Sequence, residues 1–142
     1  MYGIVVYQGN ILLSHENYRN REFTKFPGGG LEWGESTHEC LIREFKEELN
    51  IEVTPGFLFH ATESVQLSSF YPQDQVIAIY FLVNSNEFDK IIVGQRKSAN
   101  PDKGERFEWV PLNKFDVAQL TFPTDREAAV KLLGKEGVTL NV

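Results

Sequence analysis

Apolar stretches of four to eight residues recur along the chain and predict a protein rich in strands. The ranges 2–7 and 11–14 flank the turn residues Gln8-Gly9-Asn10, which predicts a hairpin. The polar segment 15–22 is expected to be an exposed loop. The range 76–83 is the most apolar and is expected to be the central strand. Further strands are expected at 23–26, 51–53, 57–63 (continued by 64–70), 87–93 and 107–110, with Pro55-Gly56 as a break and 71–74 as a turn.

One strong helix is expected to begin near Ser36. Ser36 and Glu39 have the spacing of a capping box, and Asn50 can close the helix because Asn tolerates the left-handed conformation. Apolar residues at a spacing of four give the helix one buried stripe: Leu41, Phe45 and Leu49.

The C-terminal part predicts two more helices after a polar loop at 95–105. The first is short, at 112–119, and the second spans 125–135 with Thr124 as its N-cap. Strands around one early helix, followed by a C-terminal helix, indicate an α/β protein with a mixed sheet in an α/β/α sandwich. No repeat or linker interrupts the chain, so we expect one domain over residues 1–142.

The composition is typical of a globular protein without membrane segments. Hydrophobic residues make up 42% of the 142 residues and charged residues 24%. No apolar run approaches the length of a membrane span, and no signal-peptide pattern is present. A single cysteine, Cys40, favours a reducing, cytoplasmic location.

Negative charge is concentrated in one short segment. The net charge of the chain is −6, which argues against stable nucleic-acid binding. Residues 29–51 carry six acids and two bases, a net of −4. Clustered carboxylates repel one another unless a cation lies among them.

Three of these acids are placed to share one face of the helix. Glu44, Glu47 and Glu48 stand at i, i+3 and i+4, so their carboxylates converge. Hard oxygen donors of this kind suit Mg²⁺ or Mn²⁺ rather than Zn²⁺. A solvated acidic helix face is the competing interpretation.

The residues before and within the helix favour the metal site over a solvated face. Glycines 28–30 let the backbone pass close to a metal or to phosphate oxygens. The same loop can fold Glu35 back toward the acidic patch. Arg43 can pair with Glu47 at i+4 or reach back to Glu35, which would orient the ligands.

This stretch resembles the Nudix box, Gly-x5-Glu-x7-Arg-Glu-U-x-Glu-Glu-x-Gly-U, where U is aliphatic or bulky. The motif covers 23 residues and is highly specific, and the one departure is Asn50 in place of the last glycine. The resemblance extends to Pro27 before the glycines and to Trp109-Val110-Pro111. The matching positions are Gly29, Glu35, Arg43, Glu44, Phe45, Glu47, Glu48 and Ile51.

The resemblance implies a Nudix-type fold and hydrolysis of a nucleoside diphosphate linked to another group. It implies Mg²⁺, with Mn²⁺ as a possible substitute, and attack of water on one phosphorus. It assigns metal binding and catalysis to Glu44, Glu47 and Glu48, with Gly28 as a further metal contact. Arg43 then orients the catalytic carboxylates and Glu35 supports them. Many members add an acid from outside the box, for which Glu105 and Glu108 are candidates here, although an ordinary surface charge is the preferred interpretation of each.

The substrate pocket is less clearly marked. Phosphate contacts are expected from Arg19, Arg21 and Lys25, together with the backbone of Gly29 and Gly30, although solvated loop charges are an equal alternative. Aromatic residues could stack on a base, but at strand spacing they more often belong to the core. These candidates are Phe26, Phe57, Phe59, Phe70, Tyr71 and Tyr80.

Four functions are weighed on the resemblance. The preferred one is cleavage of a (deoxy)nucleoside triphosphate or related nucleotide. ADP-ribose or sugar-nucleotide pyrophosphatases form the first alternative, although they usually carry more chain before the box than the 28 residues here. A catalytically silent, nucleotide-sensing Nudix module is the second. An RNA-decapping or RNA-binding role is the third; it would call for a basic groove or an additional domain, and the charge balance weighs against it. The expected partner is a small nucleotide, with no membrane, and the chain is expected to be a monomer or a homodimer.

Overall fold

The strands form two sheets that meet near the start of the chain. The structure, a computed structural model, describes residues 1–94 and 103–134, with only the backbone described at Lys103. In the first sheet, β6 (Ile79–Asn84) lies between β1 (Tyr2–Ile4) and β5 (Thr54–Ala61). It is a mixed sheet, because β1 runs parallel to β6 and β5 runs antiparallel to it. The apolar segment expected to be central is therefore central, although its strand begins at Ile79.

The second sheet is antiparallel and contains β2 (Val6–Tyr7), β3 (Asn10–Tyr18), β4 (Arg21–Lys25) and β7 (Lys103–Pro111). The N-terminal hairpin is confirmed between β2 and β3, but only residues 6–7 of the predicted first arm take part, because residues 2–4 form β1 and pair with β6. Its turn residues Gln8 and Gly9 have φ of 48° and 73°, which suits the tight turns of hairpins.

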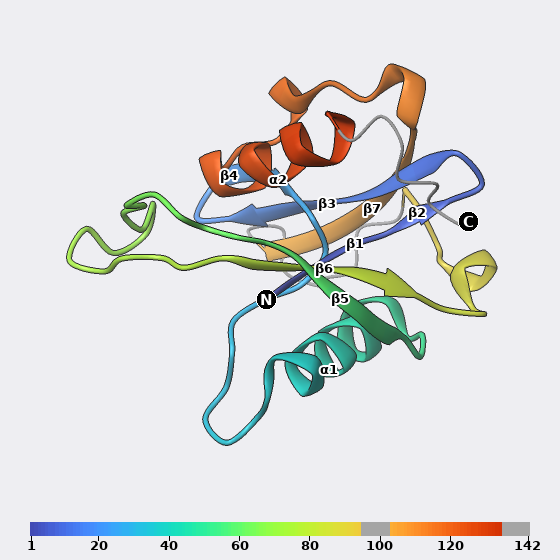
Figure 1. Cartoon of the computed structure of the whole chain (residues 1–142), viewed down its shortest axis with the longest axis horizontal. Helices are drawn as coiled ribbons and strands as arrows, with labels where there is room; N and C mark the ends of the chain where they lie inside the picture. The colour runs from blue at the N-terminus through green and yellow to red at the C-terminus, as the bar shows by residue number, and fades with distance from the viewer. Residues whose placement is uncertain (95–102, 135–142) are drawn as a thin grey trace.

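Side chains that alternate along the strands build a hydrophobic cluster on each side of the sheets. Ile4, Leu13 and Tyr80 belong to the cluster under α2 (Pro123–Leu133). Their neighbours in sequence, Val5, Leu12 and Phe81, belong to the cluster under α1 (Thr37–Leu49). The two helices thus cover opposite faces of the strands, as Figure 1 shows, and the α/β expectation is confirmed.

The prediction of a loop at 15–22 is wrong, and the difference affects the site. β3 continues to Tyr18 and β4 begins at Arg21. Arg19 and Asn20 form a two-residue turn, with φ of 51° and 60°. Part of this hairpin faces solvent, so its strands carry many polar residues. A prediction based on apolar stretches therefore did not identify them as strands.

Other differences concern short elements. Pro55-Gly56 does not break β5, which absorbs irregular register at that point, and 64–70 forms only an isolated bridge from Leu67 to Gln75. A 3₁₀ turn, Phe88–Lys90, replaces the strand expected at 87–93. Two more 3₁₀ turns, Leu112–Lys114 and Val117–Gln119, replace the helix expected at 112–119.

The last helix begins slightly before the expected position. Its first residue is Pro123 and its N-cap is Phe122, so Thr124 lies inside the first turn. Proline is favoured there because the first helical N–H has no intrahelical partner. Residues 95–102 of the expected polar loop lie outside the described residues, whereas 103–105 belong to β7.

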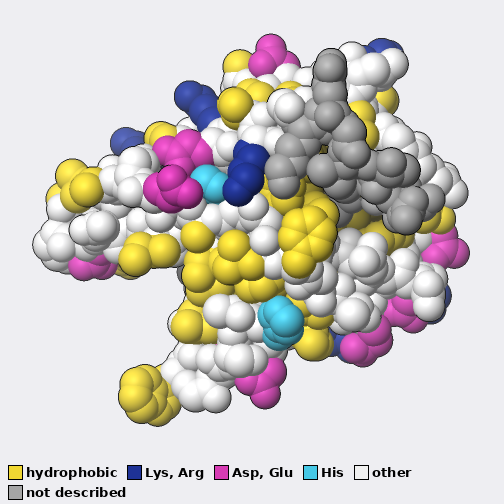
Figure 2. Space-filling view, in the orientation of Figure 1, with side chains coloured by type: hydrophobic (Ala, Val, Ile, Leu, Met, Phe, Trp, Pro, Cys, Tyr) yellow, Lys and Arg dark blue, Asp and Glu magenta, His cyan; other side chains and the backbone are white. Residues whose placement is uncertain are grey.

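Hydrophobic side chains are also exposed on part of the surface. Figure 2 shows them gathered on the face crossed by β5, where Phe57 and Leu58 are 57% and 55% exposed. In the part of the chain that the structure describes, neither helix is long and apolar enough to cross a membrane.

Candidate active site

Local capping fixes both ends of α1. The Ser36 hydroxyl accepts from the Glu39 N–H at 3.2 Å, and the Glu39 carboxylate accepts from the Ser36 N–H at 2.7 Å. Asn50 closes the helix in the left-handed conformation, with φ 54° and ψ 38°. Both caps agree with the sequence prediction. The apolar stripe is buried, so the acidic residues point away from the core.

Arg43 is the centre of an ion-pair network on α1. Its guanidinium donates two hydrogen bonds to Glu35, at 2.7 and 3.0 Å, and one to Glu44 at 2.9 Å. It also reaches the Gly30 carbonyl at 3.0 Å and Glu47 at 3.4 Å. The hydrogen bonds from Arg43 lower the pKa of Glu35 to about 2, so this carboxylate stays charged. The several hydrogen bonds from this one guanidinium hold the glycine loop and Glu44 in a fixed arrangement.

Two glycines of the loop lie close to other parts of the chain. A Cβ on Gly29 would overlap the Glu44 carboxylate, and a Cβ on Gly28 would overlap the Met1 carbonyl. Gly28 also has φ of 134°, which other residues rarely adopt. The loop backbone therefore lies directly against one of the predicted metal ligands.

A buried lysine lies among acids that come from several elements. The Lys25 amine donates to the Gly28 carbonyl at 2.8 Å and pairs with Glu16 at 3.3 Å. Burial alone would lower the pKa of Lys25, but the Glu48 and Glu16 carboxylates raise it overall, so the amine is charged.

Two of the acids are themselves shielded from solvent. Burial, and secondly the neighbouring Glu105 carboxylate, raise the pKa of Glu48. Burial also raises the pKa of Glu105, which accepts a 2.5 Å hydrogen bond from the Ser14 hydroxyl. Because burial and repulsion from neighbouring carboxylates oppose the ionisation of these two carboxyls, a bound cation would favour their charged forms.

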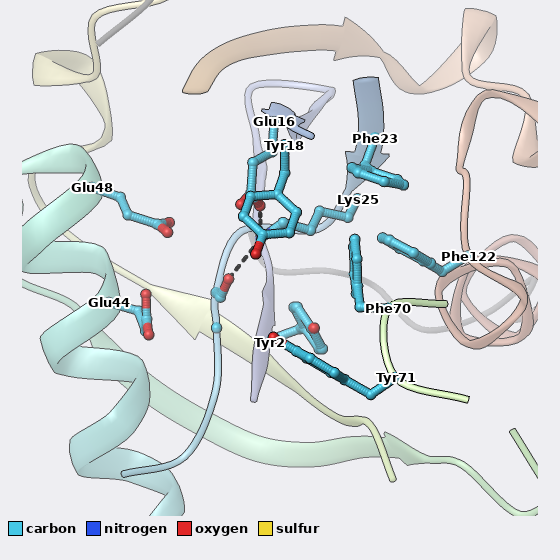
Figure 3. Close-up of a pocket in the computed structure, with 12 residues that line it drawn as sticks. Tyr2, Glu16, Tyr18, Phe23, Lys25, Glu44, Glu48, Phe70, Tyr71 and Phe122 are labelled. Atoms are coloured by element: carbon cyan, nitrogen blue, oxygen red, sulfur yellow. Dashed lines mark hydrogen bonds and ion pairs between the residues drawn. The ribbon is translucent and has the colours of Figure 1, made fainter. Parts of the chain in front are cut away.

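One cleft of about 410 Å³ is lined by Glu16, Lys25, Gly28, Gly29, Glu44 and Glu48, together with a set of aromatic residues. Figure 3 shows Glu44 and Glu48 projecting from α1 on one side and the rings of Phe23, Phe70 and Phe122 on the other, with Lys25 between them. The volume lies within the range of small-molecule sites. The cleft thus has an acidic end and an aromatic end.

Strand alternation explains which side chains reach the cleft. Leu12 packs under α1, so Ser14, Glu16 and Tyr18 on β3 face the same side. Their partners on β4 are Lys25, Phe23 and Arg21, and Glu16 pairs with Glu105 on β7.

The remaining predicted site residues lie at the margin or elsewhere. Glu47 has a side chain 60% exposed and contacts Arg43 without lining the cleft. Glu108 lies on the opposite face of β7 and pairs with His15 at 2.9 Å. Arg19 lies over the Tyr18 ring at 5.1 Å, and Arg21 is exposed at the start of β4. Of the two acids proposed from outside the box, Glu105 lies next to Glu48, which lines the cleft, although Glu105 is not itself a lining residue.

Sequence reasoning missed several lining residues. Glu16 and Tyr18 fell in the segment expected to be a loop, and Phe122 precedes a helix whose start was misplaced. Recognising Arg19-Asn20 as a hairpin turn would have placed Glu16 opposite Phe23.

The donor chemistry of the acidic end suits a hard divalent cation. Carboxylates of Glu44, Glu48 and Glu105 and the glycine carbonyls are oxygen donors, as Mg²⁺ prefers. Within residues 1–94 and 103–134, however, no three acidic, His or Cys side chains converge closely enough to hold an ion as they stand. Glu44 is instead turned toward Arg43.

Comparison with known proteins gives a family for the chain. The NUDIX domain model matches residues 2–133. An RNA pyrophosphohydrolase of Campylobacter jejuni is 38% identical over 65 residues, covering 42% of this chain and 42% of that protein. The matched region therefore spans less than half of the curated relative's length.

Solved structures show the same fold. A MutT NUDIX hydrolase of Burkholderia pseudomallei has a TM-score of 0.65 at 22% identity, covering 92% of this chain and 94% of its own. A MutT structure described for Aliivibrio salmonicida and Vibrio cholerae has a TM-score of 0.57 at 26% identity, covering 93% and 92%.

The family match extends from β1 to the end of α2 and includes the capped helix, the glycine loop and the Arg43 network. The sequence resemblance to the Nudix box is therefore confirmed at the level of the whole fold. The chain belongs to the Nudix family.

Proposed function

We propose that this enzyme uses Mg²⁺, or Mn²⁺ in its place, to hydrolyse a pyrophosphate bond in a nucleoside triphosphate or a related nucleotide. The observation that carries the proposal is the cleft itself. It joins buried carboxylates and a charged lysine to a set of aromatic rings within one volume of about 410 Å³. A nucleotide offers the matching chemistry, a polyphosphate at one end and a flat base at the other.

Glu44, Glu47 and Glu48 would hold the metal, with the Gly28 carbonyl as a further contact. Bound there, Mg²⁺ supplies charge neutralisation of the phosphates and a more acidic water. Glu47 lies outside the cleft, and its contact with Arg43 at 3.4 Å leaves the side chain largely exposed and able to turn. The Gly28 carbonyl already accepts from Lys25, but a carbonyl oxygen has two lone pairs.

The chain's own residues would position the reactants. Arg43 holds Glu35 and Glu44 against the loop. Lys25 and the backbone of Gly29 and Gly30 would contact phosphate oxygens. Arg19 and Arg21, at the tip of the β3–β4 hairpin, would meet the outer phosphates at the rim.

Glu105 is the candidate proton acceptor from outside the box. Its raised pKa means that it binds a proton more readily than an exposed glutamate, and the Ser14 hydroxyl fixes its orientation.

A nucleotide panel with Mg²⁺, with products resolved by chromatography, tests this proposal. Release of pyrophosphate and a nucleoside monophosphate supports the triphosphatase assignment. Paired monophosphates from ADP-ribose or a sugar nucleotide would assign the enzyme to the alternative class. Absence of turnover, with tight binding of one nucleotide, would identify a sensor and contradict the proposal.

A second candidate is removal of pyrophosphate from a triphosphorylated RNA end. The observation that favours it is the 38% identity over 65 residues to an RNA pyrophosphohydrolase. The net charge of −6 weighs against strong binding to the rest of an RNA chain. Comparing kcat/KM for a triphosphorylated oligonucleotide with that for the matching free nucleotide separates the two.

The assembly is proposed to be a monomer or a homodimer of single-domain chains. Within the described residues, β5 is an edge strand of its sheet and carries the exposed side chains of Phe57 and Leu58, which supports the dimer as an option. Light scattering of the purified protein distinguishes the two.

A further inference from the structure

The aromatic end of the cleft is assembled from elements distant in sequence. Tyr18 and Phe23 come from the β3–β4 hairpin, Phe70 from the segment between β5 and β6, and Phe122 from the start of α2. None of these residues belongs to the Nudix box, so the family match assigns them no role. Figure 3 shows the three phenylalanine rings grouped at one side of the cleft.

The rings form a rigid surface rather than a loose patch. Phe23 and Phe122 stack with centroids 5.3 Å apart and planes 15° apart. Phe70 makes edge-to-face contacts with two rings. Its centroid lies 5.2 Å from that of Phe23 with planes 71° apart, and 5.5 Å from that of Tyr18 with planes 79° apart. Edge-to-face pairs of this kind are favourable arrangements. The Ser68 hydroxyl further fixes Phe70 by accepting from its N–H at 3.2 Å.

The polar groups at this end are few. Among the described lining residues, the aromatic end offers the hydroxyls of Tyr2, Tyr18 and Tyr71, and the cleft lining includes no amide or guanidinium side chain. Of the charged residues of the cleft, Glu44 and Glu48 project from α1, whereas Glu16 lies between the two ends and its carboxylate is paired with Lys25 at 3.3 Å. Bases are told apart by the donors and acceptors on their edges, which amide, carboxylate or guanidinium groups read.

We propose that the aromatic end holds a nucleotide base by ring stacking against Phe70 and its neighbours, without reading the edge of the base. The inference rests on the proposed function and adds a specificity to it. The enzyme distinguishes a nucleotide from a bare polyphosphate, but discriminates weakly among the four bases. Stacking has this property because every base presents an aromatic face.

The base is assigned to this cleft and not to its neighbour. A smaller cavity of about 160 Å³ shares Tyr2, Phe70 and Phe122 with the cleft and has polar groups, including Gln66 and Thr124. That cavity contains neither Lys25 nor an acidic side chain among its lining residues. A nucleotide whose phosphates lie at the acidic end reaches the aromatic end of the same cleft first.

The test compares ATP, GTP, CTP, UTP and inorganic tripolyphosphate with Mg²⁺. We expect kcat/KM for the four nucleotides to agree within about tenfold and to exceed that for tripolyphosphate by about tenfold or more. Phe70→Ala should raise KM for all four nucleotides by about tenfold, because the stacking surface is lost. Phe70→Tyr keeps an aromatic ring at this position and should have a KM close to that of the wild type.

Val65→Ala is the matched control, because Val65 lies on the same segment, is 74% exposed and does not line the cleft. A preference above a hundredfold for one base would overturn the inference and point to edge reading in the smaller cavity. An unchanged KM in Phe70→Ala would also overturn it.

Binding separates the inference from the proposed function. Equilibrium binding of nucleotides with a methylene group in place of the bridging phosphate oxygen needs no turnover. Similar Kd values for the four bases, weakened by Phe70→Ala, would support stacking even where hydrolysis of the natural nucleotides fails and the proposed function is wrong. No measurable binding, or binding insensitive to Phe70→Ala, would overturn the stacking inference alone.

Discussion

At the residue scale, Arg43 shows how one side chain can couple a loop to a helix. It holds both oxygens of Glu35 and one oxygen of Glu44, and it also reaches the Gly30 carbonyl. A planar guanidinium can satisfy these acceptors together, whereas an ammonium group cannot do so with the same geometry. The sequence offered two partners for Arg43, Glu47 at i+4 or Glu35 across the loop, and the structure shows contacts with both.

Arg43→Lys should therefore keep the charge but loosen Glu44. We expect kcat to fall by about 10–100-fold, the usual cost of losing a group that orients metal ligands. Steady-state kinetics with Mg²⁺ titration measures it. Arg106→Lys, which alters an ion pair with Glu22 on the surface at 3.2 Å, is the matched control. Equal kcat values for Arg43→Lys and Arg106→Lys would show that Arg43 does not position the metal ligands.

Asp125 makes a separate prediction about stability. It is 1% exposed and accepts from the Tyr80 hydroxyl at 2.9 Å, and burial raises its pKa to about 7. Because the folded-state pKa lies above that of the unfolded chain, folding favours the protonated form. The stability contribution is complete below about pH 4 and is lost as the pH rises through about 7.

The measurement is urea unfolding of the wild type and Asp125→Asn from pH 4 to pH 8. The free energy of unfolding of the wild type should decline relative to the variant across this range, because Asn cannot ionise. A difference between the two proteins that stays constant with pH would show that Asp125 does not titrate as described.

At the element scale, α1 was predictable because its signals are local. Ser36, Glu39 and Asn50 mark the ends, and the apolar stripe marks the buried face. The β3–β4 hairpin was not predictable in the same way, because its pairing depends on a turn at Arg19-Asn20 that contains no glycine. The consequence was functional, because Glu16 and Tyr18 line the cleft only when that hairpin forms.

The cap at Asn50 should contribute measurably to the stability of the helix that carries Glu47 and Glu48. Asn50→Ala should lower the free energy of unfolding by about 1 kcal/mol, because alanine is strained in the left-handed conformation. Asn50→Gly should stay close to the wild type, within about 0.5 kcal/mol, because glycine adopts it freely. Urea denaturation measures both, and equal losses for the two variants would contradict the explanation.

At the scale of the whole molecule, the site lies where the two sheets meet. The Gly3 N–H donates to the Pro27 carbonyl at 2.8 Å, and Tyr2 pairs with Gly28. The glycine loop is thereby attached to β1 of one sheet while it continues from β4 of the other. The α/β class followed from the order of elements, but the aromatic end of the cleft could not be predicted, since Phe70 and Phe122 meet only in the tertiary fold.

Metal binding at this junction should stabilise the whole chain. Mg²⁺ at about one hundred times its Kd should add about 2.7 kcal/mol to the free energy of unfolding, and chelation should remove it. Thermal unfolding with Mg²⁺, compared with NaCl at equal ionic strength, measures the effect. An equal rise in melting temperature with both salts would indicate screening of surface charge instead of a site.

The most direct test of the central claim is the Mg²⁺-dependent rate of nucleotide hydrolysis in Glu48→Gln. Glu48 lies in the cleft beside Glu44 and Glu105, and amide for carboxylate removes a charge with little change of shape. We expect kcat to fall at least about a hundredfold with folding intact, while Glu63→Gln, at an exposed position outside the cleft, keeps the wild-type rate. A folded Glu48→Gln enzyme with near wild-type turnover would contradict the claim that these carboxylates form the catalytic metal site.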